Sequence, residues 1–110
     1  MRWLVLLFPI LSLTAQDFKS EISVVQFSAP FTQDSEISLK PFKSYNTYTF
    51  HITEKQEVFD SEEIKYLPTV ILYHNGEEIK RIESGISLKL PDDSVKKIQK
   101  EIDKIIESKF

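Results

Sequence analysis

The sequence predicts a small domain that mixes strands and helices around one core. Two apolar runs, Ile22–Phe27 and Thr69–Tyr73, are rich in β-branched residues and have the length of buried strands. The second run is followed by Asn75-Gly76, the dipeptide most typical of a two-residue β-hairpin turn. The segment after Pro91 instead repeats apolar residues at helical spacing. These observations together favour an α/β or α+β domain.

Length and composition fit a single globular domain. The chain has 110 residues, of which 41% are hydrophobic and 28% are charged, so there is room for one core. A net charge of −3 argues against a nucleic-acid-binding protein, which would need a basic surface to neutralise phosphates. The chain contains no cysteine, so we expect the core to stabilise the fold without disulfides.

The N-terminus is typical of a secretion signal. Arg2 precedes the apolar segment Leu4–Leu13, which is followed by Thr14 and Ala15. Such a run is too short for a helix to span a hydrocarbon core of about 30 Å. We therefore expect residues 1–15 to be a signal peptide and residues 16–110 to be an exported domain, periplasmic or extracellular, without membrane contact after cleavage. An uncleaved anchor or a buried N-terminal strand is the alternative.

The first half of the exported domain predicts a strand, a helix and a second strand. After the strand at Ile22–Phe27, Asp34 or Ser35 can cap a helix, which Pro41 must kink or end. The residues that this helix would bury are Ile37, Leu39 and Phe42. In Thr47–Ile52, large apolar residues alternate with polar ones, which is the pattern of a half-buried strand.

The second half predicts a helix, a hairpin and a final helix. The first of these helices is expected within Gln56–Tyr66, and its inward side chains would be Val58, Phe59 and Ile64. The strand that returns after Asn75-Gly76 is expected at Glu78–Ile82. The final helix starts at Pro91-Asp92-Asp93-Ser94 and packs by one stripe, because its apolar residues recur every three or four positions. These residues are Val95, Ile98, Ile102 and Ile105.

Two segments carry a resemblance to the thioredoxin family. Val24–Phe31 is similar to the strand and turn that present the redox dithiol, and Leu67–Glu77 is similar to the hairpin that follows the family's cis-proline. The two segments fall in the family's order and at roughly its spacing. The resemblance covers about Ile22–Phe110 and implies an α/β thioredoxin-like fold. In that fold a central mixed β-sheet of about four to five strands is flanked by helices on both faces.

The Cys-x-x-Cys motif of that family is absent. Thr32 and Ser35 stand at the two cysteine positions, with Gln33 and Asp34 between them. Gln26 stands where the family has a buried, proton-handling aspartate, and an amide cannot take that role. The resemblance thus implies a degenerate, redox-inactive site, no catalytic residue, no cofactor and no enzyme activity. A hydrolytic site on the two hydroxyl residues would need an adjacent base, and the predicted strands place the histidines elsewhere.

The resemblance also implies that a peptide-binding groove is retained. Its residues would be Phe31, Leu67, Pro68, Ser84 and Gly85. The Leu67–Pro68 bond would be cis, a state of only about 5–6% of such bonds in folded proteins. In the family, the backbone of the residue before this proline pairs with an extended substrate segment. The alternatives are that Pro68 only begins a strand, that Phe31 belongs to the core, and that Gly85 is a plain turn residue.

Metal binding is not expected. His51 and His74 lack the spacing of paired metal ligands and are more typical of surface residues on strands. The acidic residues between Glu54 and Glu63 lack the spaced oxygen donors of a calcium loop and suit a solvated helix face.

Three functional hypotheses remain. The preferred one is an exported, non-catalytic binding module that holds extended segments of partner proteins by strand-like pairing. The second is an accessory of a redox pathway, in cell redox homeostasis, whose thiols are supplied by a partner. The third is a domain with a purely structural or assembly role. The fold alone does not separate these hypotheses.

Overall fold

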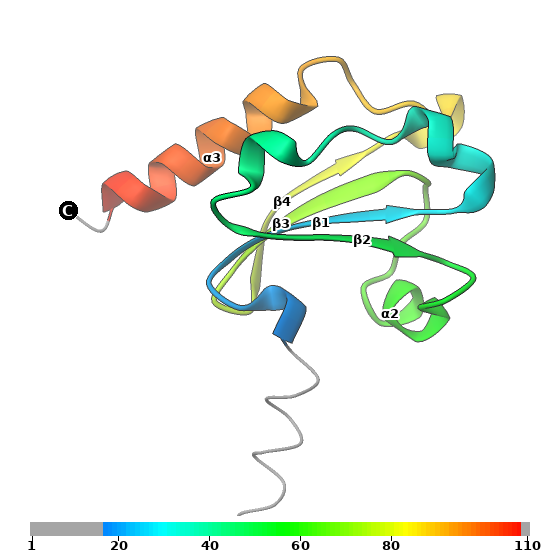
Figure 1. Ribbon diagram of the computed structural model, residues 1–110, viewed down its shortest axis with the longest axis horizontal. Coiled ribbons are helices and arrows are strands. Elements are labelled where there is room, and N and C mark those ends of the chain that lie inside the picture. The colour runs from blue at the N-terminus through cyan, green and yellow to red at the C-terminus, as the bar shows by residue number, and fades with distance from the viewer. Residues whose placement is uncertain (1–16, 109–110) are drawn as a thin grey trace, which may run out of the picture.

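Four strands form the centre of the protein in the computed structural model, which describes residues 17–108 (Figure 1). They are β1 (Ile22–Ser28), β2 (Asn46–His51), β3 (Thr69–His74) and β4 (Glu77–Glu83), in the sheet order β2-β1-β3-β4. β1 and β2 are parallel, whereas β1 with β3 and β3 with β4 are antiparallel. The predicted signal peptide, residues 1–15, lies outside the described residues. Within the described part, no helix has the length and apolar character needed to cross a membrane.

Helices cover both faces of this sheet, as the sequence predicts. Helix α3 (Ser94–Ser108) packs on one face and helix α2 (Gln56–Ser61) lies at the other (Figure 1). Successive side chains of a strand point to opposite faces. Val24 therefore belongs to the core under α3, and Val25 belongs to the core under α2. The expected mixed sheet with helices on both faces is confirmed.

The core on the α2 face is mainly aromatic. The Phe27 ring meets those of Phe50 and Phe59 edge to face, with centroid distances of 5.9 Å and 5.2 Å. Phe18, from the 3-10 helix Asp17–Lys19, adds a further edge contact with Phe50 at 5.4 Å. Aromatic rings prefer such edge contacts because their faces are negative and their edges positive.

The hairpin and the final helix form where the sequence places them. Asn75 and Gly76 have φ values of 50° and 91°, and a type I′ turn needs positive φ at both positions. In α3, Ile98 and Ile102 are fully buried against the sheet, and Val95 packs at the margin of the same core. The apolar stripe of α3 therefore stabilises the helix through tertiary packing.

The helix predicted after Ser35 is wrong. The chain instead forms a 3-10 helix at Pro30–Ser35, an extended stretch, and a second 3-10 turn at Lys40–Phe42. One physical reason is Pro41, whose ring cannot be accommodated inside an α-helix. The expected inward residues nevertheless face the core: Phe42 is fully buried, and Ile37 and Leu39 pack against it.

Helix α2 is shorter than predicted, because it ends at Ser61 rather than Tyr66. Glu63 has φ = 54°, a left-handed conformation that an α-helix cannot contain. Phe59 is buried as predicted, and Val58 and Ile64 pack around the same core. The inward face was thus predicted correctly although the end of the helix was not.

Candidate functional site

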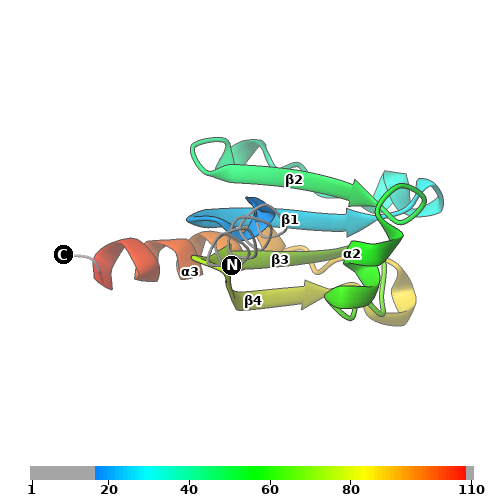
Figure 2. The same ribbon diagram turned by 90° about the horizontal axis from the view of Figure 1, so that it is seen from below.

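The residues of the degenerate motif and of the predicted groove lie at one end of the sheet. Phe27 of β1 is opposite Thr69 of β3, which is in turn opposite Glu83 of β4. The segments 28–35, 67–68 and 84–88, which adjoin these three positions, therefore meet at the same end, here called the turn end. Figure 2 shows the loops that follow β1 and β4 and helix α2 gathered at this end.

Thr32, at the first cysteine position, is buried and its hydroxyl is fully engaged. Its Oγ1 lies 3.0 Å from the Ser28 hydroxyl, accepts from the Ala29 N–H at 3.1 Å and lies 3.2 Å from the Ala29 carbonyl. Thr32 is only 2% exposed. No carboxylate or imidazole is among these partners, so Thr32 stabilises the turn and has no base that would activate it.

The remaining residues of the degenerate motif, Gln33, Asp34 and Ser35, do not form a common reactive site. Gln33 and Asp34 are exposed, and Ser35 is half-buried. Ser35 ends the 3-10 helix at Pro30–Ser35 instead of capping an α-helix. A nucleophile at this turn would therefore lack the dipole of a following α-helix, which in redox sites lowers the pKa of a thiol.

Gln26 fixes the chain that passes over β1. Its buried side chain accepts the Ile37 N–H at Oε1, at 2.8 Å, and donates from Nε2 to the Ile37 carbonyl, at 3.0 Å. Both ends of the amide are thus used by one residue of the extended stretch. A carboxylate in the same place would accept the first bond but, when ionised, would have no hydrogen for the second.

The Leu67–Pro68 peptide bond is cis, as the resemblance implies. The Pro68 carbonyl accepts the Ser84 N–H at 3.2 Å, and the Thr69 hydroxyl donates to the Tyr66 carbonyl at 2.6 Å. Pro68 is buried and Leu67 is half-buried. Among the hydrogen bonds of the described residues, none involves the main-chain N–H or C=O of Leu67.

Three large apolar side chains are exposed at the turn end. Phe31 is 72% exposed, Ile86 is 95% exposed and Leu88 is 43% exposed. Phe31 is therefore not part of the core. The sequence prediction missed Ile86, because it alternates with polar residues and is followed by Leu88 and Leu90, a pattern that does not distinguish it from a half-buried residue.

Ser84 and Gly85 shape the loop that carries Ile86. Ser84 is buried, and Gly85 has φ = 69° with open space around the position of a Cβ atom. Glycine is therefore favoured there by backbone conformation and not by crowding. Of the five predicted groove residues, Phe31 is exposed, Leu67 and Gly85 are half-buried, and Pro68 and Ser84 support the loop from within.

The two histidines lie at different ends of the sheet. His51, at the end of β2, has its Nε2 3.2 Å from Glu36 Oε2, so the two groups form an ion pair when His51 is protonated. His74, at the end of β3, lies beside the Asn75 amide at 3.2 Å. Residues 17–108 contain no group of three side chains suited to hold a metal ion.

A second polar cluster, missed from sequence, surrounds Glu62. This carboxylate accepts the Tyr73 hydroxyl at 2.6 Å and pairs with Lys19 at 2.8 Å. Burial raises the pKa of Tyr73 well above its ordinary value, and the bond to Glu62 raises it further. Arg81 donates to the Glu62 carbonyl at 2.7 Å, while its hydrogen bond with Glu78 raises its own pKa. The cluster joins the end of α2 to β3 and β4 and has the character of a structural network.

A polar cavity of about 220 Å³ lies at the opposite end of the sheet from the turn end. Glu21 and Asn75 line it, and both have positive φ, at 48° and 50°. The Asn75 N–H donates to the Glu21 carbonyl at 2.9 Å, which ties the start of β1 to the hairpin. These unusual conformations therefore have a structural explanation.

No family model matches the sequence, and no curated protein resembles it closely enough to count as a relative. Solved structures do resemble it. A thioredoxin from Nicotiana alata is 19% identical with a TM-score of 0.59, covering 83% of this chain and 82% of its own. A Malassezia sympodialis thioredoxin is 14% identical with a TM-score of 0.58, and the match covers 78% of this chain and 81% of that one. The oxidised thioredoxin of Plasmodium falciparum is 22% identical with a TM-score of 0.55, and the match covers 76% of this chain and 83% of that one.

These similarities establish the class of fold. The chain has an open, mixed α/β sheet of the thioredoxin-like kind, as the sequence predicts. Unlike a thioredoxin that exchanges disulfides, this chain has no cysteine to supply a thiol.

Proposed function

We propose that this protein is a non-catalytic thioredoxin-fold binding protein, which holds extended segments of partner proteins at the turn end. The observation that carries the proposal is the main chain of Leu67, whose N–H and C=O have no hydrogen-bond partner among the described residues. An extended peptide lying beside Leu67 would satisfy both groups at once. Pairing of this kind supplies affinity through the main chain and leaves selectivity to neighbouring side chains.

The exposed apolar residues of the turn end support the same function. Phe31 and Ile86 follow β1 and β4, so they flank the loop at Leu67 from both sides in the order of the strands. Exposed apolar side chains that gather in one region are typical of protein-binding surfaces. They would cover apolar side chains of a bound segment on either side of its main chain.

The residues of the degenerate motif support binding without exchange chemistry. The Thr32 hydroxyl is held by Ser28 and Ala29, and the Gln26 amide is held by Ile37. Each side chain therefore stabilises the frame of the turn end. We propose further that the domain acts outside the cytoplasm, because Leu4–Leu13 has the character of a signal-peptide core.

A capture experiment with matched variants tests this function. The tagged full chain, incubated with the periplasmic or extracellular fraction of the cell that exports it, should retain partner proteins that a Phe31→Asp, Ile86→Asp variant does not. Ile79→Asp is the matched control, because Ile79 is an exposed isoleucine on β4, away from the turn end. In NMR spectra, an added partner segment should shift the Leu67 amide. Equal capture by all three proteins, or an unchanged Leu67 signal, would refute the proposal.

A further inference from the structure

One edge of the sheet lacks the features that protect an edge from pairing with another chain. β2 is an outer strand, and its sequence Asn46–His51 contains no proline and no lysine, arginine, aspartate or glutamate. The opposite edge is β4, which carries five charged residues and has a register shift against β3. Charges and irregular register are the means by which sheets discourage further pairing. β4 is therefore protected, whereas no strand within residues 17–108 pairs with the outer edge of β2.

The direction of the β2 main chain shows which of its N–H and C=O groups point away from the sheet. The Ile52 N–H donates to the Ser28 carbonyl at 3.0 Å, so Ile52 points its main chain toward β1. These directions alternate along a strand, so Tyr48 and Phe50 also point toward β1. Thr47 and Thr49 point their N–H and C=O groups away from the sheet. His51 points outward too, but its carbonyl already accepts two N–H groups of the following turn.

We propose that two copies of this chain pair antiparallel through β2, in the register that places Thr47 opposite the partner's Thr49. Each such pair exchanges two hydrogen bonds, so the outward groups of both threonines are satisfied in both copies. Tyr48 then lies opposite the partner's Tyr48 as a non-hydrogen-bonded pair, in which the Cα atoms are about 4.5 Å apart. Aromatic and Thr–Thr pairs across strands are among the stabilising ones.

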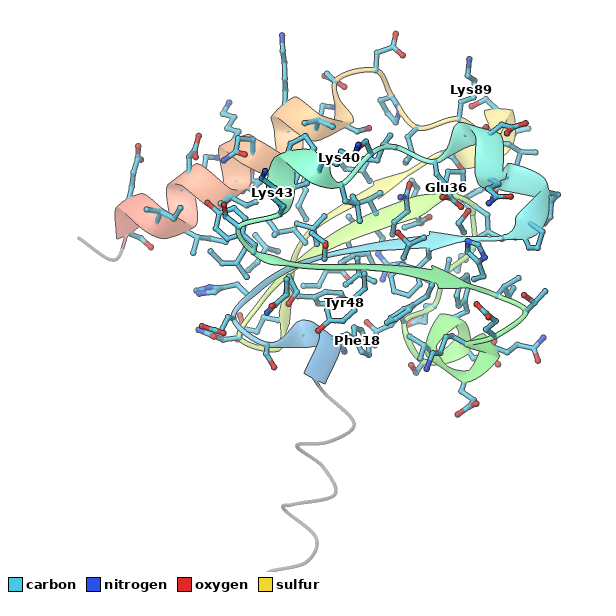
Figure 3. The ribbon with its side chains drawn as sticks, viewed as in Figure 1. Phe18, Glu36, Lys40, Lys43, Tyr48 and Lys89 are labelled. Atoms are coloured by element: carbon cyan, nitrogen blue, oxygen red, sulfur yellow. The ribbon has the colours of Figure 1, made fainter. Side chains whose placement is uncertain are left out.

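The charges beside β2 favour a second copy in this orientation. Lys40 and Lys43 precede the strand, while Glu54 and Glu57 follow it, and all four residues are exposed (Figure 3 labels the two lysines). Antiparallel pairing brings the basic start of one strand beside the acidic end of the other. A parallel arrangement would place the lysines of both copies together. Lys55, also near the acidic end, instead lies over the Phe50 ring at 5.9 Å.

The aromatic face of β2 gives the pair a second area of contact. Tyr48 and Phe50 point to the α2 face, with their ring centroids 5.8 Å apart. Phe18 and Tyr48, both labelled in Figure 3, belong to the same core on this face, where Phe18 contacts Phe50 at 5.4 Å. Tyr48 is only half-buried, so pairing would remove more of its apolar ring from water. This inference does not depend on the proposed peptide binding, since β2 is two strands away from β3, which Leu67 precedes.

The full chain tests the pairing through its mass and its amide exchange. Sedimentation velocity should show conversion of monomer to dimer between about 5 µM and about 1 mM. Over the same range, hydrogen exchange of the Thr47 and Thr49 amides should slow by about tenfold or more. A monomer throughout would overturn the proposal. Exchange that is fast at every concentration, or equally slow in the monomer, would also overturn it.

Two double variants that differ at one residue test the register. Thr47→Lys with Thr49→Lys places like charges opposite each other and should weaken association by at least tenfold relative to the native chain. Thr47→Lys with Thr49→Glu places opposite charges together in the proposed register and should retain the dimer. If the two double variants dimerise with equal affinity, the proposed register is wrong. Ile79→Lys, on the opposite edge, should leave association unchanged, and circular dichroism would verify that each variant is folded.

Discussion

Gln26 holds Ile37 by both polar atoms of its side-chain amide. The bonds, 2.8 Å to Oε1 and 3.0 Å from Nε2, attach an extended stretch to β1 where the sequence predicted a helix. Gln26 is almost fully buried, so neither bond has water as a substitute. Gln26, which the sequence resemblance aligns with the proton-handling aspartate of thioredoxins, thus has a structural role.

Replacing Gln26 by glutamate should destabilise the protein in a pH-dependent manner. An ionised carboxylate still accepts the Ile37 N–H but faces the Ile37 carbonyl without a hydrogen, so burial raises the pKa of the new residue. Because the folded-state pKa is raised, the variant is most stable below the unfolded value of about 4.3 and loses stability as pH rises. At pH 7 we expect a loss of about 2–3 kcal/mol, measured by urea unfolding, and a smaller loss at pH 4.

The matched control for this variant is Gln33→Glu, the same change at an exposed glutamine. Its stability should stay within about 0.5 kcal/mol of the native protein at both pH values. A Gln26→Glu protein as stable as the control at pH 7 would show that the Nε2 bond to Ile37 has no energetic importance.

The strands and the hairpin could be predicted because residues close together in the sequence determine their conformation. The run Thr69–His74 is buried on both faces, and Asn75-Gly76 permits the positive φ values of its turn. The stretch between Ser35 and Asn46 could not be predicted, because its conformation depends on Gln26, eleven residues before Ile37. The end of α2 has a similar cause, since Arg81 of β4 binds the carbonyls of Glu62 and Glu63. Such long-range bonds leave no periodic pattern in the sequence.

The sequence could predict which segments form the candidate site, but not which side chains in it are buried, exposed or hydrogen-bonded. The cis bond before Pro68 and the meeting of three loops follow from the resemblance. That Thr32 is buried and bonded to Ala29, and that Ile86 is almost fully exposed, depends on the 3-10 turns at Pro30–Ser35 and Gly85–Ser87. Turn geometry of this kind is set by a few hydrogen bonds and not by composition.

Export can be tested on the full chain. When a C-terminally tagged protein is produced in a bacterial host, the form recovered outside the cytoplasm should begin near Gln16. N-terminal sequencing or intact mass would measure this. A charged residue placed within the apolar segment, as in Leu6→Arg, should keep the protein in the cytoplasm with Met1 retained. Recovery of the unprocessed chain outside the cytoplasm would contradict the cleaved signal.

Introducing two cysteines at the positions that the resemblance indicates should not create a thioredoxin-like active site. In a Thr32→Cys, Ser35→Cys variant, the first thiol would be buried and no α-helix would follow it. Burial disfavours the thiolate, and the dipole that would offset burial is missing. We expect the pKa of Cys at position 32 to stay at or above about 8.5, as measured by thiolate absorbance, and insulin reduction to remain at the buffer level. A pKa below about 7 with measurable reduction would contradict this structure of the turn.

Tyr73 should remain protonated in the folded protein at alkaline pH. Its pKa is raised by burial and by the carboxylate of Glu62, to which it donates at 2.6 Å. Below the alkaline unfolding transition, the native protein and a Tyr73→Phe variant should therefore show the same phenolate absorbance. In urea the variant should show a quarter less than the native protein, because it has lost one of four tyrosines.

The same group should make stability fall with pH above about 10. Because the folded-state pKa of Tyr73 is raised, the unfolded chain releases this proton first, and the folded state loses up to about 1.4 kcal/mol per pH unit. Tyr73→Phe has no such proton, so its unfolding free energy should decline less steeply above pH 10, although it starts lower because Glu62 has lost a donor. Urea unfolding between about pH 8 and pH 11 would measure both slopes. Equal slopes, or a smaller phenolate signal from the folded variant, would show that Tyr73 ionises in the native state and that its bond to Glu62 is weak.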